Sequence, residues 1–451
     1  MSSDTFSSSM RAGTSTSLYS RGHSIYGIED RVVLDIGSLY IKCGFSGESR
    51  PRHIVPTWSR QRRSQDLEGE AYAVSGDFSE LYGLDISTRS SKSYAAFEQR
   101  LARLLHDIYY RLLLTDPKSS KVIVLESPLL PICIKQSIAK VLFQKLQVPS
   151  ISFTPSHLLA LLTIGQTTGL VVDCGHLEMT VLPIYAARPL IPFTTSSPLA
   201  GRAMNTRLRK LLIDHGRFIA PSSLHRSIAP RTNIPQTMLT ADVIEDIKTR
   251  ICIVSPVPVS GDSSSDPIEL WQDFSAATDL YHPISTTAEG KSWLFVPGWV
   301  RERAAEVLFE NDNDDDQKSV VEAILDALHK AQPDIRKPLI SNVLLIGGTS
   351  MLPGFRTRLH QELLRVMRTP TDHEKRHYSA VLKLHQYLGL ADEDGGDVFK
   401  SNVRAWIGGS LAGTLKTSGP EVVKERWSGT VPDWSTGVLV PSASVTDVQQ
   451  H

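Results

Sequence analysis

Cysteine is scarce in this sequence, with four residues among 451. Cys43, Cys133, Cys174 and Cys252 lie in apolar segments typical of strands or helices, and no two of them have Cys-x-x-Cys spacing. This arrangement argues against a zinc site and against a disulfide framework. We therefore expect reduced, buried thiols.

An excess of charge and long apolar runs are also missing. Lys plus Arg number 48, as do Asp plus Glu, so no general field attracts nucleic acid or anionic lipid. No apolar run reaches membrane-spanning length, and the Ser/Thr-rich start lacks the apolar core of a signal peptide. We therefore expect an intracellular protein that neither binds nucleic acid nor inserts into a membrane. The apolar content of 41% is sufficient for large cores.

Two short segments share one pattern. Residues 32–38 read Val-Val-Leu-Asp-Ile-Gly-Ser, residues 171–177 read Val-Val-Asp-Cys-Gly-His-Leu, and a second apolar run follows each. Both patterns predict a buried strand, an Asp-x-Gly turn and another strand. Such a turn exposes backbone N–H groups to a phosphate, and the Asp can hold a metal ion through water. One copy is weak support, since many hairpins use Asp and Gly for the turn alone, but two copies indicate a nucleotide cleft between related halves.

A third segment lies far downstream. Residues 342–355 predict a buried strand that enters a Gly-Gly-Thr turn and then a helix. Because Gly347 and Gly348 lack side chains, a flat base or a ribose can lie against their backbone, and the helix start adds free N–H donors.

In order and spacing, these segments resemble the actin family, and the similarity covers roughly residues 30–434. Further matching segments are Pro51-Arg52, Thr167-Thr168-Gly169, Pro183-Ile184-Tyr185, Gly201-Arg202, Asp246-Ile247-Lys248, Asp334-Ile335-Arg336-Lys337 and Trp406-Ile407-Gly408-Gly409-Ser410. The resemblance implies an α/β, actin-like duplicated ATPase fold with two related domains around a nucleotide cleft.

The expected organisation follows this resemblance and the local composition. In chain order we expect a disordered arm at 1–29, a first domain at 30–164 with a short divergent outer subdomain at 58–94, a second domain at 165–354 with an outer subdomain at about 201–289, a return to the first domain at 355–434, and a tail at 435–451. Helical spacing predicts helices over 95–114 and 135–146, and another helix after the acidic run 311–316. The carboxylates of that run should cap the N-terminus of the helix that follows. Residues 370–402 are expected to be a polar insertion.

The resemblance also implies ATP or ADP with Mg²⁺ in the cleft, as a structural ligand. The implied contacts are Asp35, Gly37, Ser38, Lys42, Asp173, Gly175, Lys248, Gly347, Gly348, Thr349 and Met351. Asp35 and Asp173 would flank the magnesium ion through water, and Lys42 would reach the β- and γ-phosphates. Lys42 could instead form a structural ion pair with Asp35.

Several positions depart from the family pattern. Leu39 stands where actin has glycine in the first loop, and a side chain at a turn that requires positive φ is unfavourable. Ser156 and Thr180 occupy the positions of the glutamine and histidine that hold the attacking water in actin, and Thr249 replaces an acidic residue that meets the ribose. His157 and His176 are near in sequence and could substitute as a base, although a lone histidine is more often structural. The departures predict a degenerate ATPase without catalytic residues.

Within the family, the chain is most similar to the actin-related proteins at the pointed end of dynactin, in residues 42–48 with Pro51-Arg52, 155–163, 308–313, 347–355 and 431–434. That similarity implies a cytoplasmic, cytoskeletal subunit whose partners are an actin-like filament protomer and the other pointed-end subunits, and which does not form a homopolymer. Two alternatives stay open: an actin-related subunit of a nuclear chromatin remodeller, and an active phosphotransferase of the same fold. The first lacks a basic localisation cluster, since residues 60–63 are too short. The second lacks a recognisable carboxylate base.

Overall fold

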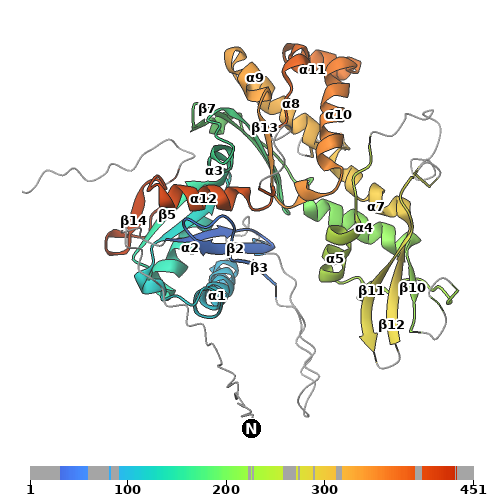
Figure 1. Ribbon diagram of the computed structural model, residues 1–451, viewed down its shortest axis with the longest axis horizontal. Helices are drawn as coiled ribbons and strands as arrows, with labels where there is room; N and C mark the ends of the chain where they lie inside the picture. The colour runs from blue at the N-terminus through green and yellow to red at the C-terminus, as the bar shows by residue number, and fades with distance from the viewer. Residues whose placement is uncertain are drawn as a thin grey trace, which may run out of the picture.

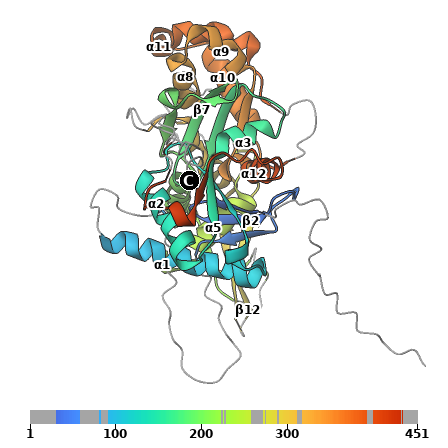
Figure 2. The same cartoon turned by 90° about the vertical axis from the view of Figure 1, so that its left-hand side faces the viewer.

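The computed structural model describes most of the chain, and Figures 1 and 2 show it from two sides. The described residues are 31–58, 81–82, 91–221, 225, 228–256, 271–272, 275–287, 290–310, 317–391, 399–431 and 433. The predicted arm at 1–29, most of the predicted subdomain at 58–94, the acidic run and the tail at 435–451 lie outside them. In the part described, no helix is long and apolar enough to cross a membrane.

The first half is built on a six-stranded sheet in the order β14-β5-β4-β1-β2-β3. Its strands are β1 (Val32–Ile36), β2 (Tyr40–Phe45), β3 (His53–Pro56), β4 (Val122–Glu126), β5 (Ser150–Pro155) and β14 (Glu421–Val423). β1 and β2 form an antiparallel hairpin, and β4 runs parallel to β1. Val32 and Leu34 face one apolar core while Val33 faces another, so the continuous apolar run reflects a sheet that is covered on both sides.

The second half repeats this plan. Its sheet has the order β13-β6-β7-β8, with β9 paired to β7. The strands are β6 (Gly169–Cys174), β7 (Met179–Tyr185), β8 (Arg188–Pro189), β9 (Thr195–Ser197) and β13 (Val343–Ile346). Again a hairpin, β6-β7, has a parallel neighbour, β13. Asp35 pairs with Lys42 across the first hairpin, and Asp173 pairs with Thr180 across the second. The predicted duplicated α/β fold is therefore confirmed.

A third, smaller sheet lies at the lower right of Figure 1. It has the order β10-β12-β11, from β10 (Arg217–Ile219), β11 (Leu280–Thr287) and β12 (Gly290–Val296). The helices α4 (Gly201–His215), α5 (Ala241–Ile251) and α7 (Gly298–Arg303) lie beside it, and the 3₁₀ turn Ala305–Leu308 follows α7. Further 3₁₀ turns along the chain are Pro117–Ser119, Ile191–Phe193, Gln236–Met238, Thr349–Met351, Lys383–Tyr387 and Lys424–Arg426.

The two helices predicted in the first half are present, but their ends differ from the prediction. α1 (Ser91–Asp107) continues as a π-helical turn at Ile108–Leu112, and α2 (Ile132–Lys140) continues as another at Val141–Lys145. The predicted stripe on α1 is buried, with Phe97 at 3% exposure and Leu101 fully buried. Wider i→i+5 hydrogen bonds close both ends, a feature that apolar spacing does not reveal.

The structure differs from the expected domain boundary at residue 354. The helices α8 (Val320–Lys330), α9 (Pro333–Ile340), α10 (Phe355–Arg368) and α11 (Asp372–Leu382) group at one end of the molecule (Figure 2). Phe355, Leu359 and Leu363 of α10 share a core with Ile324 and Val343 of the second half. Residues 355–391 therefore belong with the second half, because the apolar face of α10 is buried against α8, and Phe399 is already packed against a core of the first half.

The first part of the expected polar insertion at 370–402 forms a helix, α11. Thr371 and Glu374 make a reciprocal capping box, and Tyr378 and Val381 are buried three residues apart. The Tyr378 hydroxyl donates to Asp326 of α8 at 2.9 Å. α8 is likewise capped by a box of Ser319 and Glu322, whereas the acidic run lies outside the described residues.

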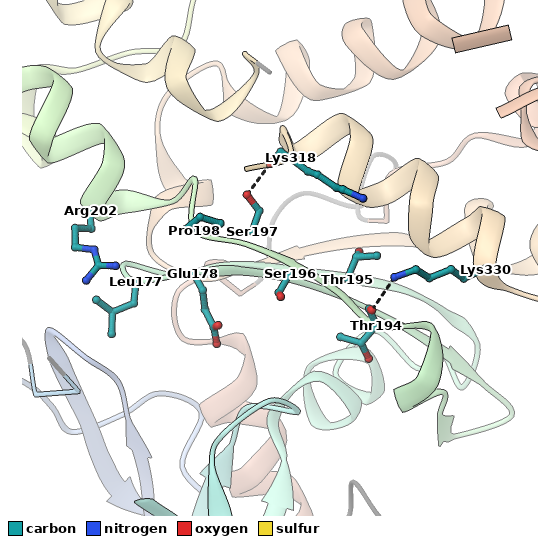
Figure 3. Close-up of a pocket in the computed structure, with 10 residues that line it drawn as sticks. All are labelled: Leu177, Glu178, Thr194, Thr195, Ser196, Ser197, Pro198, Arg202, Lys318 and Lys330. Carbon is teal, nitrogen blue, oxygen red and sulfur yellow. Dashed lines mark hydrogen bonds between the residues drawn. The ribbon is translucent and has the colours of Figure 1, made fainter. Parts of the chain in front are cut away.

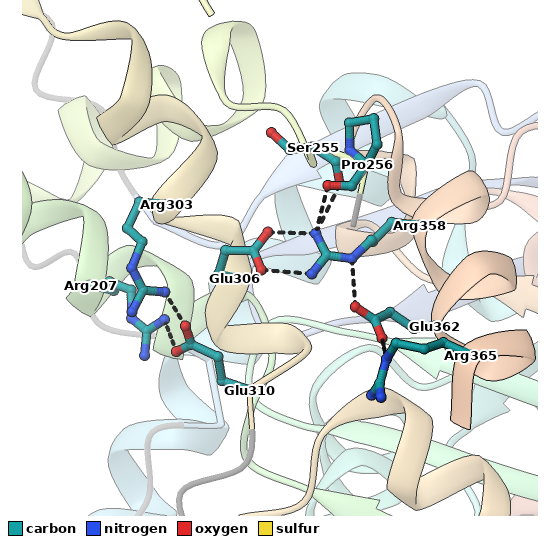
Figure 4. Close-up of polar contacts among 9 residues, drawn as sticks. All are labelled: Arg207, Ser255, Pro256, Arg303, Glu306, Glu310, Arg358, Glu362 and Arg365. Carbon is teal, nitrogen blue, oxygen red and sulfur yellow. Dashed lines mark hydrogen bonds and ion pairs between the residues drawn. The ribbon is translucent and has the colours of Figure 1, made fainter. Parts of the chain in front are cut away.

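A buried ion group joins α10 to the 3₁₀ turn Ala305–Leu308 (Figure 4). The Arg358 guanidinium donates to both carboxylate oxygens of Glu306 at 2.9 Å and to Glu362 at 3.0 Å. The side chains of Arg358 and Glu306 are only 4% and 5% exposed. Bidentate pairing satisfies charges that would be very costly to bury alone.

Two helices cross between the halves. α3 (Ser156–Leu162) follows β5 of the first sheet and leads to β6 of the second, and α12 (Arg404–Thr414) packs on it. A Cβ at Gly408 of α12 would lie 2.2 Å from the Leu159 carbonyl oxygen, so glycine allows the two helix backbones to meet. Trp406, fully buried, donates its indole N–H to Val33. The crossing helices place both Asp-x-Gly turns on one cavity.

Candidate nucleotide site

A cavity of about 690 Å³ lies between the two hairpins. All eleven residues implied by the resemblance line it: Asp35, Gly37, Ser38, Lys42, Asp173, Gly175, Lys248, Gly347, Gly348, Thr349 and Met351. They come from the β1-β2 turn, the β6-β7 turn, α5 and the turn after β13. The structure thus brings together residues up to about three hundred positions apart, because the turns after β1, β6 and β13, from two different sheets, line one cavity.

Asp35 and Lys42 form a tight ion pair in the first hairpin. Lys42 Nζ lies 2.5 Å from Asp35 Oδ2, and the two side chains are 17% and 18% exposed. The cross-strand register places them directly opposite each other. The structural ion pair left open from the sequence is therefore present, in the wall of the cavity.

Asp173 occupies the matching position of the second hairpin and has a perturbed pKa. Burial raises the pKa of Asp173 to about 7, and the charges of Asp35 and Glu178 add to this rise, although Lys42 opposes it. Three carboxylates therefore converge on this part of the cavity. A cation between them would relieve their repulsion and the cost of burying the Asp173 charge.

The Gly-Gly-Thr turn closes the cavity from the second half. Gly347 has φ +92, and a Cβ there would lie 2.4 Å from both Asp173 Oδ1 and the Cys174 carbonyl oxygen. A Cβ at Gly348 would meet no heavy atom within 4 Å. The Thr349 hydroxyl donates to the Gly175 carbonyl at 2.7 Å and so joins this turn to the β6-β7 turn.

Lys248 does not extend freely into the cavity. Its Nζ lies 2.6 Å from Glu245 one turn earlier on α5, and both side chains are 7% exposed. Asn205 also donates to Glu245, at 2.9 Å. Thr249, at the acidic position of the family pattern, donates its hydroxyl to the Glu245 backbone carbonyl at 2.8 Å. Both lysines that line the cavity are thus paired with a carboxylate.

The positions of the family's catalytic pair carry two hydroxyls joined by an imidazole. Ser156 Oγ lies 3.1 Å from His157 Nδ1, and His157 Nε2 lies 2.9 Å from Thr180 Oγ1. Ser156 and Thr180 line the cavity, whereas His157 is fully buried. Burial lowers the pKa of His157 to about 3, so the ring is neutral at physiological pH and has no basic nitrogen directed at the cavity.

The prediction of backbone strain at Leu39 is wrong. Leu39 is not among the positive-φ residues of the described chain. It is 4% exposed, lines the cavity with its side chain packed in the wall, and accepts a backbone hydrogen bond from Thr57. Because the turn does not require a left-handed residue here, leucine is accommodated.

Sequence reasoning missed several lining residues. Glu178 and Glu245 add two carboxylates, and Asn402, from the segment before α12, adds a buried side-chain oxygen with no hydrogen-bond partner in the described structure. The first half adds an apolar wall formed by Ile36, Tyr40, Ile54, Tyr82, Leu129, Leu130 and Ile134. Such walls are assembled from four separate segments, so local motifs do not predict them.

A second cavity of about 560 Å³ lies beside the first, between β9 and α8 (Figure 3). Leu177 and Glu178 line both cavities. Ser197 donates its hydroxyl to the Lys318 carbonyl at 2.6 Å. None of the eleven predicted residues lines this second cavity.

The first cavity fits a nucleotide with a divalent ion. Gly348 leaves open space beside it, the Asn402 oxygen is an orphaned acceptor, and Asp35 and Asp173 supply hard oxygen ligands. In the described residues no group of three or more His, Cys, Asp or Glu side chains is arranged to hold a metal ion directly. An ion held mainly through water and phosphate oxygens is consistent with both observations.

Comparison with known proteins agrees with this geometry. The family profile described as Actin matches residues 29–427. The chain belongs to the actin family. Members of this family typically bind a nucleotide with a divalent metal ion.

Three relatives are similar over most of the chain. Actin-related protein 10 of Dictyostelium discoideum is 27% identical over 446 residues, 91% of this chain and 88% of that protein. Actin-like protein 7A of Mus musculus is 25% identical over 338 residues, covering 74% and 70%. Actin-like protein 7B of Rattus norvegicus is 26% identical over 345 residues, covering 74% of each. The chain is therefore an actin-related protein.

Proposed function

We propose that this actin-related protein is a non-catalytic, cytoplasmic subunit of dynactin. It would cap the pointed end of the short actin-like filament, contact the last filament protomer and the other pointed-end subunits, and support dynein-driven cargo transport on microtubules. The support comes from the similarity to Actin-related protein 10 over 91% of the chain and from the sequence motifs that resemble the pointed-end subfamily.

The cavity would hold ATP or ADP with Mg²⁺ as a structural wedge. The glycines at 37, 175, 347 and 348 would present backbone to the phosphates and the nucleoside, and Asp35 and Asp173 would face the ion. When bound, the ion would neutralise phosphate charge in a site whose lysines are already paired. A ligand that binds only the folded state stabilises it by about 2.7 kcal/mol at a concentration of 100 Kd.

One observation carries the non-catalytic assignment. Ser156 and Thr180 are both bound to the neutral ring of His157. Neither hydroxyl has the basicity to accept a proton from water, and His157 has both nitrogens occupied and no exposed surface. Ser156, His157 and Thr180 therefore supply no base to a water molecule at this end of the cavity.

Affinity purification of the full chain from its native cells, followed by mass spectrometry, tests the assignment to dynactin. We expect the filament protomer and the pointed-end subunits of dynactin in stoichiometric amounts. Recovery of chromatin-remodelling subunits instead would overturn the proposal. Purified protein with labelled ATP should release no phosphate above a protein-free control, and steady release would contradict the non-catalytic assignment.

A further inference from the structure

The helix α3 is the structural connection between the two halves. Leu159 on one face packs with Trp406 and Ile407 in a core of the first half. Ala160 and Leu161 on the other face pack in a core of the second half, with residues of β6, β7 and β13. Figure 1 shows α3 between the two sheets. Any change in the angle between the halves must therefore move α3 against at least one of its neighbours.

One polar contact at the start of α3, between His157 and Thr180, joins the helix to β7 of the second half. Ser156 and His157 are the first two residues of α3, and Thr180 belongs to β7 of the second half. His157 bridges the two hydroxyls with both ring nitrogens, at 3.1 Å and 2.9 Å. We call Ser156, His157 and Thr180 the hydroxyl–imidazole bridge. It is the polar counterpart of the apolar packing on the two faces of α3.

Hydrogen-bond chemistry gives the bridge a direction. A neutral imidazole has one N–H donor and one acceptor nitrogen, so one of the two hydroxyls must donate to the ring and the other must accept from it. The hydroxyl that accepts keeps its own proton for another partner. Because Ser156 and Thr180 both line the cavity, a ligand acceptor there can bind to that free proton.

We propose that the hydroxyl–imidazole bridge is an interdomain latch, in which His157 is a positioning residue that holds α3 and the β6-β7 hairpin together whether or not a ligand occupies the cavity. The observation behind the proposal is geometric: the two ring nitrogens of His157 contact one hydroxyl on α3 and one on β7. The proposal adds to the structural role proposed above for the nucleotide. It rests on that proposed function only where it places a ligand next to the two hydroxyls. It assigns a role to residues at the positions of a lost catalytic pair.

Removal of one hydroxyl without a change of shape tests the latch. Thr180→Val in the full chain leaves a ring nitrogen of His157 buried without a partner, and such a group costs enough to raise local opening about tenfold. Hydrogen–deuterium exchange should therefore be about tenfold faster at the amides of α3 and β7. Thr180→Ser retains the hydroxyl and should restore the wild-type exchange rate.

Thr195→Val is the matched control. Thr195 is also buried and donates its hydroxyl to the Ala323 carbonyl at 2.7 Å, but both residues lie in the second half. This variant should lose comparable global stability without faster exchange in α3. Ser156→Ala should be non-additive with Thr180→Val, since both act through one imidazole, and additive with Thr195→Val.

The outcomes separate the latch from the proposed function. Exchange in α3 that is the same in Thr180→Val as in the wild type or in Thr195→Val would overturn the latch. Faster exchange in Thr180→Val, with no effect of MgADP on the wild type, would support the latch and remove the structural role proposed for the nucleotide.

Discussion

Gly348→Ala should separate folding from ligand binding at the cavity. Gly348 has φ −72 and ψ −35, in the right-handed region, and a Cβ there would contact nothing within 4 Å. Alanine adopts this backbone without strain and restricts the unfolded chain. We therefore expect the free energy of unfolding to stay unchanged or to rise by about 0.4–1 kcal/mol.

The same methyl group should oppose a nucleoside. Gly348 lines the cavity, and in a ligand that fits closely against backbone an added methyl group typically costs about 1–3 kcal/mol of packing. Since about 1.4 kcal/mol corresponds to a tenfold change in affinity, MgADP should bind about tenfold more weakly or worse. Isothermal titration calorimetry of the purified chain measures this.

Gly347→Ala is the contrasting variant. A Cβ there would lie 2.4 Å from Asp173 and from the Cys174 carbonyl, on a backbone with φ +92. The left-handed conformation alone costs about 1–2 kcal/mol for alanine, and the overlap adds to it, so urea unfolding should show a loss of at least about 2 kcal/mol. If Gly348→Ala binds MgADP with wild-type affinity, the assignment of this turn to the nucleoside is refuted.

Three further substitutions probe the packing and the electrostatics. Arg358→Met leaves Glu306 buried without its bidentate partner and should lower the free energy of unfolding by about 3–5 kcal/mol; a loss below about 1 kcal/mol in urea titration would refute this. With metal removed, the raised pKa of Asp173, about 7 against an ordinary 3.8, means that the folded state binds the additional proton, so stability falls as pH rises from about 4 to about 7. Asp173→Asn should remove that fall in thermal unfolding scans, and an unchanged pH profile would contradict it. Gly408→Ala forces α12 away from Leu159 and should cost at least about 2 kcal/mol, so an unchanged unfolding midpoint would be the contrary result.

The recurrent turns were predictable because their signal is local. Each Asp-x-Gly turn is specified by seven consecutive residues, and the Gly347-Gly348 pair by two. The order of these motifs along the chain and their resemblance to one family were therefore enough to predict that Asp35 and Asp173 line one cavity. The apolar stripe of α8 was equally visible, since its period matches a helix.

The missed features depend on contacts between distant segments. Glu245 lines the cavity because it lies one helical turn before Lys248 and pairs with it, whereas the family motif at 246–248 does not include it. α11 has a polar composition that suggests a loop, yet Tyr378 and Val381 give it a buried face against α8. Leu39 shows the opposite error, since a family glycine suggested strain that the backbone here does not have.

The two parts of the proposed function, loss of catalysis and retention of a ligand site, are compatible in this fold. Stabilisation by a ligand depends on its concentration relative to Kd and not on turnover, so the turns can be kept while Ser156 and Thr180 lose the family's side chains. The hydroxyl–imidazole bridge at those positions adds a hydrogen bond between α3 and β7. For the proposed role at the end of a filament, one fixed angle between the halves would be an advantage, because a partner surface formed by both halves then needs no ordering when it binds.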